Sequence, residues 1–555
     1  MNIVLVAINA KYIHSSLAAY SLYAYLSEEE KRHVQVMEFT VNQSEEFIVS
    51  ELFRTNPGVL AFSCYIWNIH MVMSLVETFK KILPNVPIIV GGPEASYEYE
   101  ELITQGADIV VRGEGEEPFK KLVQSFISGT PNTDTVHEPT KPLPLETIPF
   151  PYNHDFTTLQ NRIIYYETSR GCVNRCGYCL SSATEGVRFL PWERVNSDLD
   201  KFLNAKIKQV KFIDRTFNCN KQHTIKIWQY LIQNDNGITN FHFEIAGEQL
   251  DNEMLNLLSN ARKGLFQFEI GVQSTNPKTL EEISRRTNTA LLFENVRKLK
   301  TFGNIHLHLD LIVGLPYEDY SSFANSFNEV FACSVSCSSL TYPHKLQVGF
   351  LKLLKGSRLR QDAGKYGIEY KKNAPYSVLK TNFISFAEIN TLHKIEHMVE
   401  TFYNATGFYS TVRYMLANSA TPFDFFHALA GYWEDTNHHT VSHKKISMYS
   451  FLHKFSQMFF PDKLHTICEL LKYDMLLQES VRTFPSWIDE YYKPDNRKIT
   501  RTTAVHNFDF NIYKWLQQLE INPDAILAEQ KIELQFDYSL SLDERVNDIR
   551  ETLEC

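Results

Sequence analysis

The sequence has few of the features that mark a membrane, secreted or nucleic-acid-binding protein. No stretch approaches the roughly 20 consecutive apolar residues that a bilayer-spanning helix needs. Residues 1–7 form a short apolar run with no basic segment, which is typical of a buried strand and not of a secretory signal. The formal net charge of −10 disfavours a general nucleic-acid-binding surface. We therefore expect a cytoplasmic protein without membrane or nucleic-acid partners.

Cysteine is also scarce, with nine residues in a chain of 555. This odd number and low density argue against a disulfide scaffold. Three of the nine nevertheless lie within eight residues, at Cys172, Cys176 and Cys179. In a reducing compartment, such a cluster indicates a metal site.

The chain is too long for one compact core, and its composition is that of a globular protein. Residues 1–130 alternate between strand and helix patterns. This alternation predicts a parallel, doubly wound sheet. The expected strands are 2–7, 34–39, 58–63, 86–90 and 109–111, and the expected helices are 16–26, 71–82 and 117–127.

Three further regions follow. Residues 131–160 are rich in proline, which predicts an extended, semi-stiff linker. Residues 161–370 return to strand–helix alternation and predict a partial (βα)6 barrel, short of the eight units of a closed barrel; the expected strands are 162–167, 209–213, 242–245, 267–272, 306–313 and 345–353. Residues 371–555 predict a mainly helical domain, with helical spacing at 392–402 and 464–477 and a strand near 532–536.

The cysteine cluster has the spacing C-x3-C-x2-C and follows the strand expected at 162–167. Cysteines this close on a short glycine loop can place three thiolates around one metal centre. With a cubane iron–sulfur cluster, three thiolates leave one iron open to a small molecule. The alternative is a structural zinc site, which normally needs a fourth ligand. No second cysteine or histidine pair lies nearby, and Cys219 is the one stray thiol.

The residues from this loop onward resemble the radical S-adenosylmethionine (radical SAM) superfamily. The loop is similar to the superfamily's cluster motif, and five later segments follow in the expected order. They are Asp214-Arg215-Thr216-Phe217, which is similar to the D-x-T-F of cobalamin-dependent members, Glu244-Ile245-Ala246-Gly247-Glu248, Glu269-Ile270-Gly271-Val272-Gln273-Ser274, Asp310-Leu311-Ile312-Val313-Gly314-Leu315-Pro316 and Leu354-Lys355-Gly356-Ser357.

The resemblance implies roles for individual residues. Cys172, Cys176 and Cys179 would hold a 4Fe–4S cluster, and S-adenosylmethionine would chelate its open iron. Other residues would contact the cofactor: Glu248, Gln273 and Ser274 at its ribose or methionine part, Val313 and Gly314 at its adenine, and Arg285 or Arg286 at its carboxylate. The alternative interpretation of the acidic residues is helix capping or surface charge, and that of Gly314 is a turn.

The first domain resembles the cobalamin-binding domain that precedes the barrel in many such enzymes. Strand ends of such sheets bind ligands, although glycines there can also simply make turns. The residues singled out are Tyr12 in the first loop, Ser63 for the nucleotide base, Gly91 and Gly92 for the nucleotide tail, and Glu114 and Glu116, which could also belong to the interface with the barrel. Many cobalamin-binding proteins carry a D-x-H-x-x-G motif whose histidine binds cobalt. Here Tyr12 stands two residues before His14 and Leu17 three residues after it, so the motif is absent and a structural role is favoured for this histidine.

Taken together, the resemblance implies a radical SAM enzyme, cobalamin-dependent, that methylates an unactivated carbon. The alternatives are a cobalamin-dependent cyclase or rearrangement enzyme, and a non-catalytic cobalamin- or redox-sensing protein. The implied partners are a small-molecule or peptide substrate and an electron donor such as flavodoxin or ferredoxin. The C-terminal domain resembles a family-specific domain of unknown role, and it could cover the barrel mouth. Its His-rich stretch at 427–443 favours a solvated loop over a metal site.

Overall fold

The structure is a computed structural model that describes residues 1–130, 134–152, 156–183, 186–334, 345–441, 443–495, 498–517, 531–542 and 544–548. The chain divides into two compact units, and each is described by itself. The first consists of Met1–Glu269, Leu280–Arg286 and Phe350–Asn382, and the second of Ile270–Thr279, Thr287–Gly349 and Phe383–Cys555. Among the described residues, no helix is long and apolar enough to cross a bilayer.

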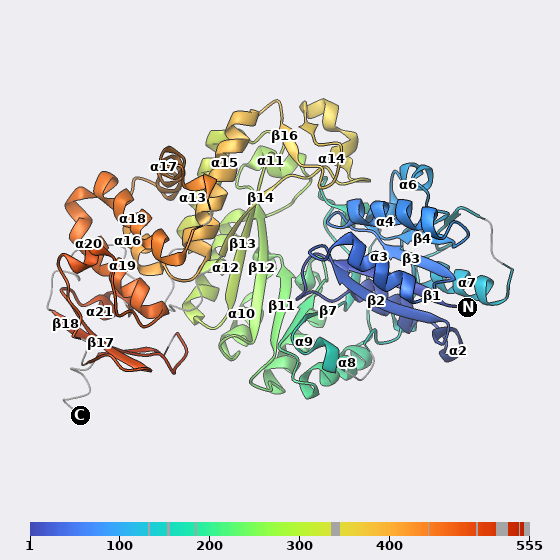
Figure 1. Cartoon of the computed structure of the whole chain (residues 1–555), viewed down its shortest axis with the longest axis horizontal. Coiled ribbons are helices and arrows are strands. Elements are labelled where there is room, and N and C mark those ends of the chain that lie inside the picture. Colours follow the sequence, from blue (N-terminus) through green and yellow to red (C-terminus); the bar gives the residue numbers. More distant parts are fainter. Residues whose placement is uncertain are drawn as a thin grey trace. The chain divides into compact units, whose positions relative to one another are not determined.

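The N-terminal domain is a six-stranded parallel sheet with helices on both faces (Figure 1). The strand order is β2-β1-β3-β4-β5-β6. The elements are β1 Ile3–Asn9, α1 Leu17–Ala24, α2 Glu28–Lys31, β2 Val34–Thr40, α3 Glu45–Arg54, β3 Val59–Ser63, α4 Ile69–Ile82, β4 Ile88–Gly91, α5 Pro93–Ser96, α6 Glu100–Thr104, β5 Ile109–Val111, α7 Glu116–Ile127 and β6 Val136–His137. All strands expected in this domain are present, and the doubly wound fold is confirmed.

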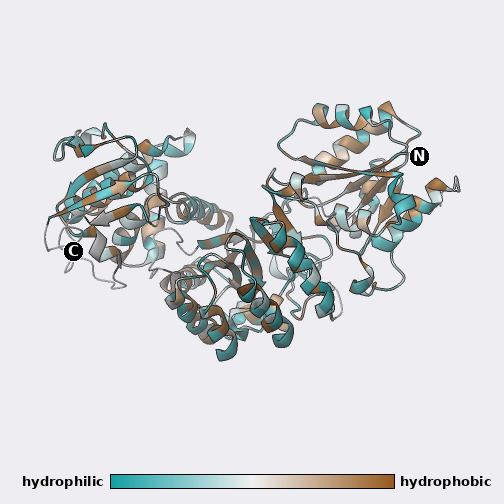
Figure 2. Cartoon of the chain, turned by 90° about the horizontal axis from the view of Figure 1, so that it is seen from below, coloured by the Kyte–Doolittle hydropathy of each residue, from teal (hydrophilic) through white to brown (hydrophobic). Residues whose placement is uncertain are grey.

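Alternate residues of β1 enter different cores, because successive side chains of a strand point to opposite faces. Val4, Val6 and Ile8 pack with α3 and α4, whereas the intervening residues pack with α1 and α7. Figure 2 shows these strands in the brown of apolar residues between helices with teal outer faces. Both faces of the sheet are therefore buried, as its continuous apolar strands require.

The first unit also contains the opening part of the second domain. Here β10 pairs in parallel with β7 on one side and with β11 on the other. Helices α8 and α9 cover this sheet. The elements are β7 Ile163–Tyr166, β8 Ser169–Gly171, β9 Val187–Phe189, α8 Trp192–Asn204, β10 Gln209–Phe212, η4 Phe217–Cys219, α9 Lys221–Gln233, β11 Asn240–Ile245, η5 Gly247–Gln249 and α10 Asn252–Ser259.

The second unit continues with the strand order β12-β13-β14. The elements of this region are β12 Phe266–Gln273, α11 Pro277–Glu282, α12 Thr289–Phe302, β13 His306–Val313, α13 Tyr320–Ser334 and β14 Lys345–Phe350. The next elements, α14 Arg358–Gln361, β15 Glu369–Tyr370 and β16 Val378–Lys380, belong to the first unit. All six strands expected between 161 and 370 are therefore present. The sequence did not predict the β8–β9 hairpin, whose strands have three residues each.

The C-terminal region is mainly helical, as expected. Helix α17 packs against α13 and α15, and aromatic rings such as Phe327 and Phe423 meet at 5.6 Å between centroids. Its elements are α15 Phe386–Met398, η7 Val399–Asn404, α16 Tyr409–Ala417, α17 Pro422–Asp435, α18 Lys445–Phe459, α19 Leu464–Gln478, α20 Ser486–Asp489, β17 Thr503–Phe508, α21 Ile512–Gln517, β18 Ile532–Asp537 and β19 Val546–Asp548. The expected strand near 532–536 is β18, which lies between β17 and β19.

Two expected domain boundaries separate strands that pair with each other. The sheet of the first domain takes β6 from the segment expected to be a linker, and β6 pairs with β5. The boundary expected at residue 370 lies within the β15–β16 hairpin. Beyond it, the Tyr376 hydroxyl donates to Glu94 at 2.5 Å in the first domain. Strands of only two or three residues, such as β6 and β15, are stabilised by their partner strands. Their own sequence is too short to show a recognisable strand pattern.

Candidate functional site

The three clustered cysteines lie in the loop that connects β8 to β9. These short strands pair antiparallel, with Gly171 opposite Val187. Gly171 has φ +108°, and a Cβ there would lie 2.2 Å from the carbonyl oxygen of Gly186. Only glycine fits this position. The hairpin thus closes the cysteine loop at its base.

Hydrogen-bond donors surround the thiols, which are not in disulfides. The backbone N–H of Asn174 points at Cys172 Sγ at 3.4 Å, and Arg285 Nη1 lies 3.9 Å from Cys176 Sγ. Burial raises the pKa of Cys176, and the Arg285 charge opposes this effect. Donors and a cation next to sulfur favour thiolate and the anionic cluster that thiolates bind.

A single-ion site is not formed here. Among the described residues, no group of three or more His, Cys, Asp and Glu side chains could hold one metal ion. Zinc would need its sulfur ligands within about 2.3 Å of one point. Three thiolates without a fourth protein ligand are the donor set of a cubane iron–sulfur cluster with one open iron, whereas structural zinc normally takes four.

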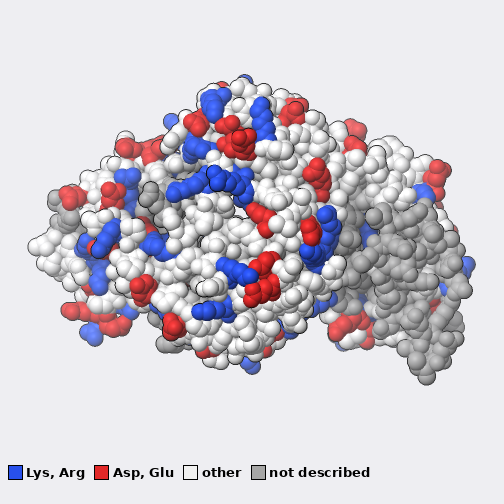
Figure 3. All heavy atoms as spheres, turned by 180° about the vertical axis from the view of Figure 1, so that it is seen from behind, with Lys and Arg blue, Asp and Glu red and all other residues white. Residues whose placement is uncertain are grey.

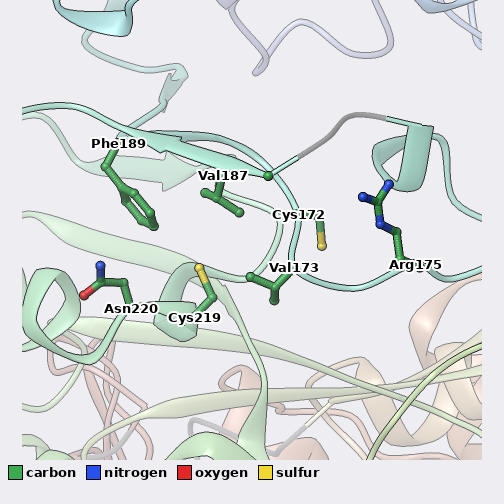
Figure 4. A pocket seen from close by; sticks show the side chains of 8 residues that line it. Cys172, Val173, Arg175, Val187, Phe189, Cys219 and Asn220 are labelled. Atoms are coloured by element: carbon green, nitrogen blue, oxygen red, sulfur yellow. The ribbon is translucent and has the colours of Figure 1, made fainter.

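A cavity of about 350 Å³ adjoins the cysteine loop (Figure 4). It brings together Cys172 from the loop and Cys219 from η4, with Phe189 of β9 on the wall. Burial raises the pKa of Cys219 to about 11, with the nearby Asp214 and Cys172 adding to the effect. Cys219 is on a different element from the three loop cysteines and lies outside their C-x3-C-x2-C spacing.

Asp214, in the D-x-T-F segment, holds the entry to the hairpin. Its carboxylate accepts hydrogen bonds from the backbone N–H of Thr168 at 3.0 Å, from the Thr168 hydroxyl at 2.6 Å and from the Ser169 hydroxyl at 2.5 Å. Burial raises the pKa of Asp214 to about 6. His223 Nε2 also meets Thr168 Oγ1 at 3.1 Å, and burial lowers the pKa of His223 to about 4. This contact was not predicted, since residues far apart in sequence make it.

Two of the predicted cofactor-binding residues face the cysteine loop within the first unit. The Arg285 side chain is close enough to Tyr178, Cys176 and Glu248 for their charges to raise its pKa, although burial opposes this. One carboxylate oxygen of Glu248, on η5, is buried without a hydrogen-bond partner among the described groups. Arg286 is exposed. Of the two arginines considered, Arg285 is the one at the loop.

The other predicted cofactor-binding residues lie in the second unit. Gln273 ends β12 with φ +70°, and Gly314 follows β13 with φ +91°, next to the buried Val313. The Ser274 hydroxyl donates to Glu318 Oε1 at 2.5 Å. Burial raises the pKa of Glu318 to about 7. The sequence analysis missed Glu318, although it lies only four residues after Gly314.

Charged side chains line one face of the strands in the first unit and were also missed. Lys211 Nζ lies 2.9 Å from Glu269 and 3.8 Å from Glu244, and His242 Nε2 lies 3.3 Å from Glu269. Burial would raise the pKa of Glu269, but His242 and Lys211 lower it to about 2. The alternation of charged residues with Phe241, Phe243 and Phe268 is the signal that could have revealed a polar inner face.

The carboxyl edge of the first sheet contains glycine backbone and aromatic rings. Gly91 ends β4, and Gly92 has φ +103°, with a Cβ there lying 2.7 Å from the carbonyl oxygen of Cys64. Ser63 is buried and donates to the Val6 carbonyl at 3.4 Å. Tyr12 is 72% exposed and lies near Arg162. A glycine edge of this kind leaves backbone open to a large ligand, so these residues fit cobalamin.

His14 lies at the same edge and makes a structural contact. Its Nδ1 lies 2.7 Å from the hydroxyl of Tyr165, on β7. Burial is the main cause that lowers its pKa. A hydrogen bond at one ring nitrogen agrees with the structural role favoured from the sequence.

Glu116 is occupied by contacts within the protein. Its carboxylate lies 2.9 Å from Arg170 Nη2, and only 6% of its side chain is exposed. Burial would raise the pKa of Glu116, but Arg170 keeps it below the usual value. Glu114 also pairs with Arg170, at 3.0 Å. Both residues thus connect the first domain to the strand that leads into Cys172.

Comparisons with known proteins match each part of this architecture. The B12 binding domain family matches residues 3–123, and the radical SAM superfamily matches residues 166–330. A protein family of unknown function (DUF4080) matches residues 364–535. The chain therefore carries a B12 binding domain followed by a radical SAM domain, as the matched segments show. Such proteins use a 4Fe–4S cluster, S-adenosylmethionine and cobalamin.

Several curated proteins resemble about half of the chain. The 2-(S-pantetheinyl)-carbapenam-3-carboxylate methyltransferase of Streptantibioticus cattleyicolor is 27% identical over 50% of this chain and 45% of its own length. The cobalamin-dependent radical SAM methyltransferase TokK of Streptomyces tokunonensis is 27% identical over 49% of this chain and 45% of its own length. The chain thus spans less than half the length of these relatives.

Solved structures share the fold at low sequence identity. OxsB, a cobalamin-dependent S-adenosylmethionine radical enzyme, has a TM-score of 0.58 at 15% identity, over 86% of this chain and 79% of its own. The radical S-adenosylmethionine methyltransferase TsrM from Kitasatospora setae has a TM-score of 0.52 at 15% identity, over 68% of this chain and 80% of its own. These matches confirm the predicted fold class.

Proposed function

We propose that the protein is a cobalamin-dependent radical SAM methyltransferase that methylates an unactivated carbon of a small molecule or peptide. The observation that carries the proposal is the loop of three free thiols closed at Gly171, with Arg285 beside it and a B12 binding domain in the same unit. The methyltransferase names of the two curated relatives support the same reaction class.

Cys172, Cys176 and Cys179 would hold the 4Fe–4S cluster, with S-adenosylmethionine at the open iron. Held there, the cluster would supply one-electron reductive cleavage of S-adenosylmethionine, the chemistry needed to activate an unactivated carbon. Bound cobalamin would supply the methyl group. The chain's own residues bind and orient these groups and exclude water.

Within that scheme, each residue at the loop has a definite task. Arg285 would pair with the methionine carboxylate through its planar guanidinium. Glu248 has a buried oxygen free to accept a hydrogen bond from the cofactor. Asp214 keeps Thr168 and Ser169 in place, so the hairpin enters the loop in one conformation.

At the first domain, Tyr12, Ser63, Gly91 and Gly92 would contact cobalamin. Gln273, Ser274, Val313 and Gly314 in the second unit would contact S-adenosylmethionine.

An electron donor such as flavodoxin or ferredoxin would reduce the cluster. On the face drawn in Figure 3, Lys and Arg side chains lie interspersed with Asp and Glu. Because thiolate-bound clusters need reducing conditions, we propose the cytoplasm as the compartment.

Anaerobic reconstitution with iron, sulfide and hydroxocobalamin tests the proposal. The wild type should bind iron and cobalamin and release 5′-deoxyadenosine when reduced with S-adenosylmethionine. Cys176→Ala should lose the iron and the 5′-deoxyadenosine. Cys219→Ser is the matched control, since Cys219 lines the same cavity but lies outside the C-x3-C-x2-C loop, and it should retain both.

Different outcomes separate the alternatives. Iron and cobalamin binding without any 5′-deoxyadenosine would favour a sensing protein. Formation of 5′-deoxyadenosine with a substrate that gains no methyl group would favour cyclisation or rearrangement. A Cys176→Ala variant that keeps its iron would refute the assignment of the cluster.

A further inference from the structure

The hairpin that encloses the cysteine loop places two arginines side by side. Arg170 on β8 is the cross-strand partner of Arg188 on β9. Like charges directly opposite each other destabilise a strand pair. A three-residue hairpin has few other contacts to offset this repulsion. We call Arg170 and Arg188 the arginine pair. Glu167 compensates Arg170 from the same segment, at 2.8 Å, and the remaining compensation comes from another domain.

The compensating charges lie in the loop after β5 of the B12 binding domain. Glu114 Oε2 is 3.0 Å from Arg170 Nη1, and the other carboxylate oxygen of Glu114 binds Arg188. Glu116 Oε1, at the first residue of α7, is 2.9 Å from Arg170 Nη2. We call Glu114 and Glu116 the acidic loop. Because the Glu114 carboxylate contacts both arginines, its negative charge offsets the repulsion between them.

Burial makes this network stronger than an ordinary surface ion pair. The side chains of Arg170 and Glu114 are each 19% exposed, and that of Glu116 is 6% exposed. Exposed pairs contribute little because water and salt screen them. Removing one member of a buried, hydrogen-bonded pair leaves its partner uncompensated, which costs much more. Only Glu167 would still pair with Arg170, at 2.8 Å.

The acidic loop and the arginine pair each lie next to a proposed cofactor site. The acidic loop follows β5 at the carboxyl edge where the first domain would bind cobalamin, and Arg170 stands two residues before Cys172. We propose that the arginine pair and the acidic loop form a clamp that couples the place of the B12 binding domain to the cysteine loop. These are positioning residues, and the inference rests on the proposed function.

The clamp should affect only one of two reactions of S-adenosylmethionine. Reductive cleavage would take one electron and give methionine and a 5′-deoxyadenosyl radical, which becomes 5′-deoxyadenosine by taking a hydrogen atom from the substrate, so it needs the cysteine loop and the substrate but not the first domain. Transfer of the methyl group to reduced cobalamin yields S-adenosylhomocysteine, so it needs the first domain at a fixed distance. Gly171 and Asp214 hold the loop independently of the acidic loop. Loss of the clamp therefore lowers S-adenosylhomocysteine selectively.

The test variant is Glu114→Gln combined with Glu116→Gln, which removes both charges without touching the cysteine loop. Asp108→Asn is the matched control, because Asp108 is in the same domain but pairs with Lys80 inside it, at 2.5 Å. In the reconstituted protein, we expect the ratio of S-adenosylhomocysteine to 5′-deoxyadenosine to fall about tenfold, as loss of a buried charge partner warrants. The control should keep the wild-type ratio.

A second measurement does not depend on activity. Amide hydrogen exchange at residues 169–171 and 187–189 should become about tenfold faster in the double variant, because the arginine pair then opens the hairpin. Arg170→Gln should give the same lowered ratio, and combining it with the double variant should lower the ratio no further.

Three results decide the matter. An unchanged ratio and unchanged exchange would overturn the clamp. An equal fall of both products together with the iron content would also overturn it, since the network would then be merely structural. If the wild type forms neither product, the proposed function fails, and the exchange rates alone support the clamp if they rise and overturn it if they do not.

Discussion

Replacing Gly171 with alanine should prevent the cysteine loop from holding its cluster. The φ of +108° lies in a region that is essentially restricted to glycine, which costs of the order of 1–3 kcal/mol for another residue. The added Cβ would also lie 2.2 Å from the Gly186 carbonyl oxygen. The oxygen belongs to the backbone, so no neighbouring side chain can move aside and the hairpin must open.

Gly186, at the other side of the same hairpin base, is the matched control. It has φ +69°, and a Cβ there would meet nothing within 4 Å. Alanine should therefore cost only about 1 kcal/mol there, the ordinary price of the left-handed conformation. The strain alone makes the variants differ by up to about 2 kcal/mol. Because the backbone collision adds to this, we expect a total difference of at least about 2 kcal/mol, or about 30-fold in the equilibrium that closes the loop.

The assay is iron bound per chain after anaerobic reconstitution, followed by the rate of iron loss to a chelator. Gly171→Ala should lose iron at least about 30-fold faster than Gly186→Ala. Circular dichroism should show that both variants keep the wild-type helix content. Equal iron retention in the two variants would refute the steric reasoning at the hairpin base.

Other buried contacts give three more predictions. Asp214→Asn turns an amide N–H₂ toward the hydroxyl donors of the hairpin entry, so iron affinity should fall about tenfold; iron content equal to the wild type would contradict this. Gly92→Ala should weaken hydroxocobalamin binding in equilibrium dialysis by at least about tenfold, because its Cβ would lie 2.7 Å from a backbone oxygen, whereas Gly129→Ala, in open space, should not. Burial lowers the pKa of His506 to about 4, and its Nε2 has no hydrogen-bond partner among the described groups. The folded state disfavours protonation of His506, so its neutral imidazole contributes fully to stability above about pH 6.5. Between about pH 6.5 and pH 4, the free energy of unfolding falls by up to about 1.4 kcal/mol per pH unit. His506→Phe should flatten the fall of Tm between about pH 7 and pH 5, and parallel curves for variant and wild type would count against the assignment.

The apolar strands were predictable because their signal is local. Strands β5 and β13 begin and end where the apolar pattern placed them, at Ile109–Val111 and His306–Val313. The three thiols of the cysteine loop were likewise predictable, since their spacing alone restricts the metal centres they can hold. The apolar pattern is strong because these strands are buried on both faces. The cysteine pattern is strong because the three residues are close together along the chain.

Residues that act through distant partners were not predictable in the same way. Glu318 resembles any acidic residue after a turn until Ser274 is found 2.5 Å away. Strand β8 has three residues and depends on β9 across a long loop. Strand β17 pairs with β18 in a region expected to be mainly helical. In each case, the stabilising contact joins segments whose local patterns are weak.

The sequence by itself determined the succession of domains, the parallel strands and the three thiols, because apolar periodicity and close spacing act along the chain. Only the tertiary structure decided that the acidic loop meets the arginine pair, that Arg285 rather than Arg286 stands at the cysteine loop, and that Cys219 lines the cavity beside Cys172. Those outcomes depend on burial and on charges brought together across dozens of residues, and local sequence carries no record of either.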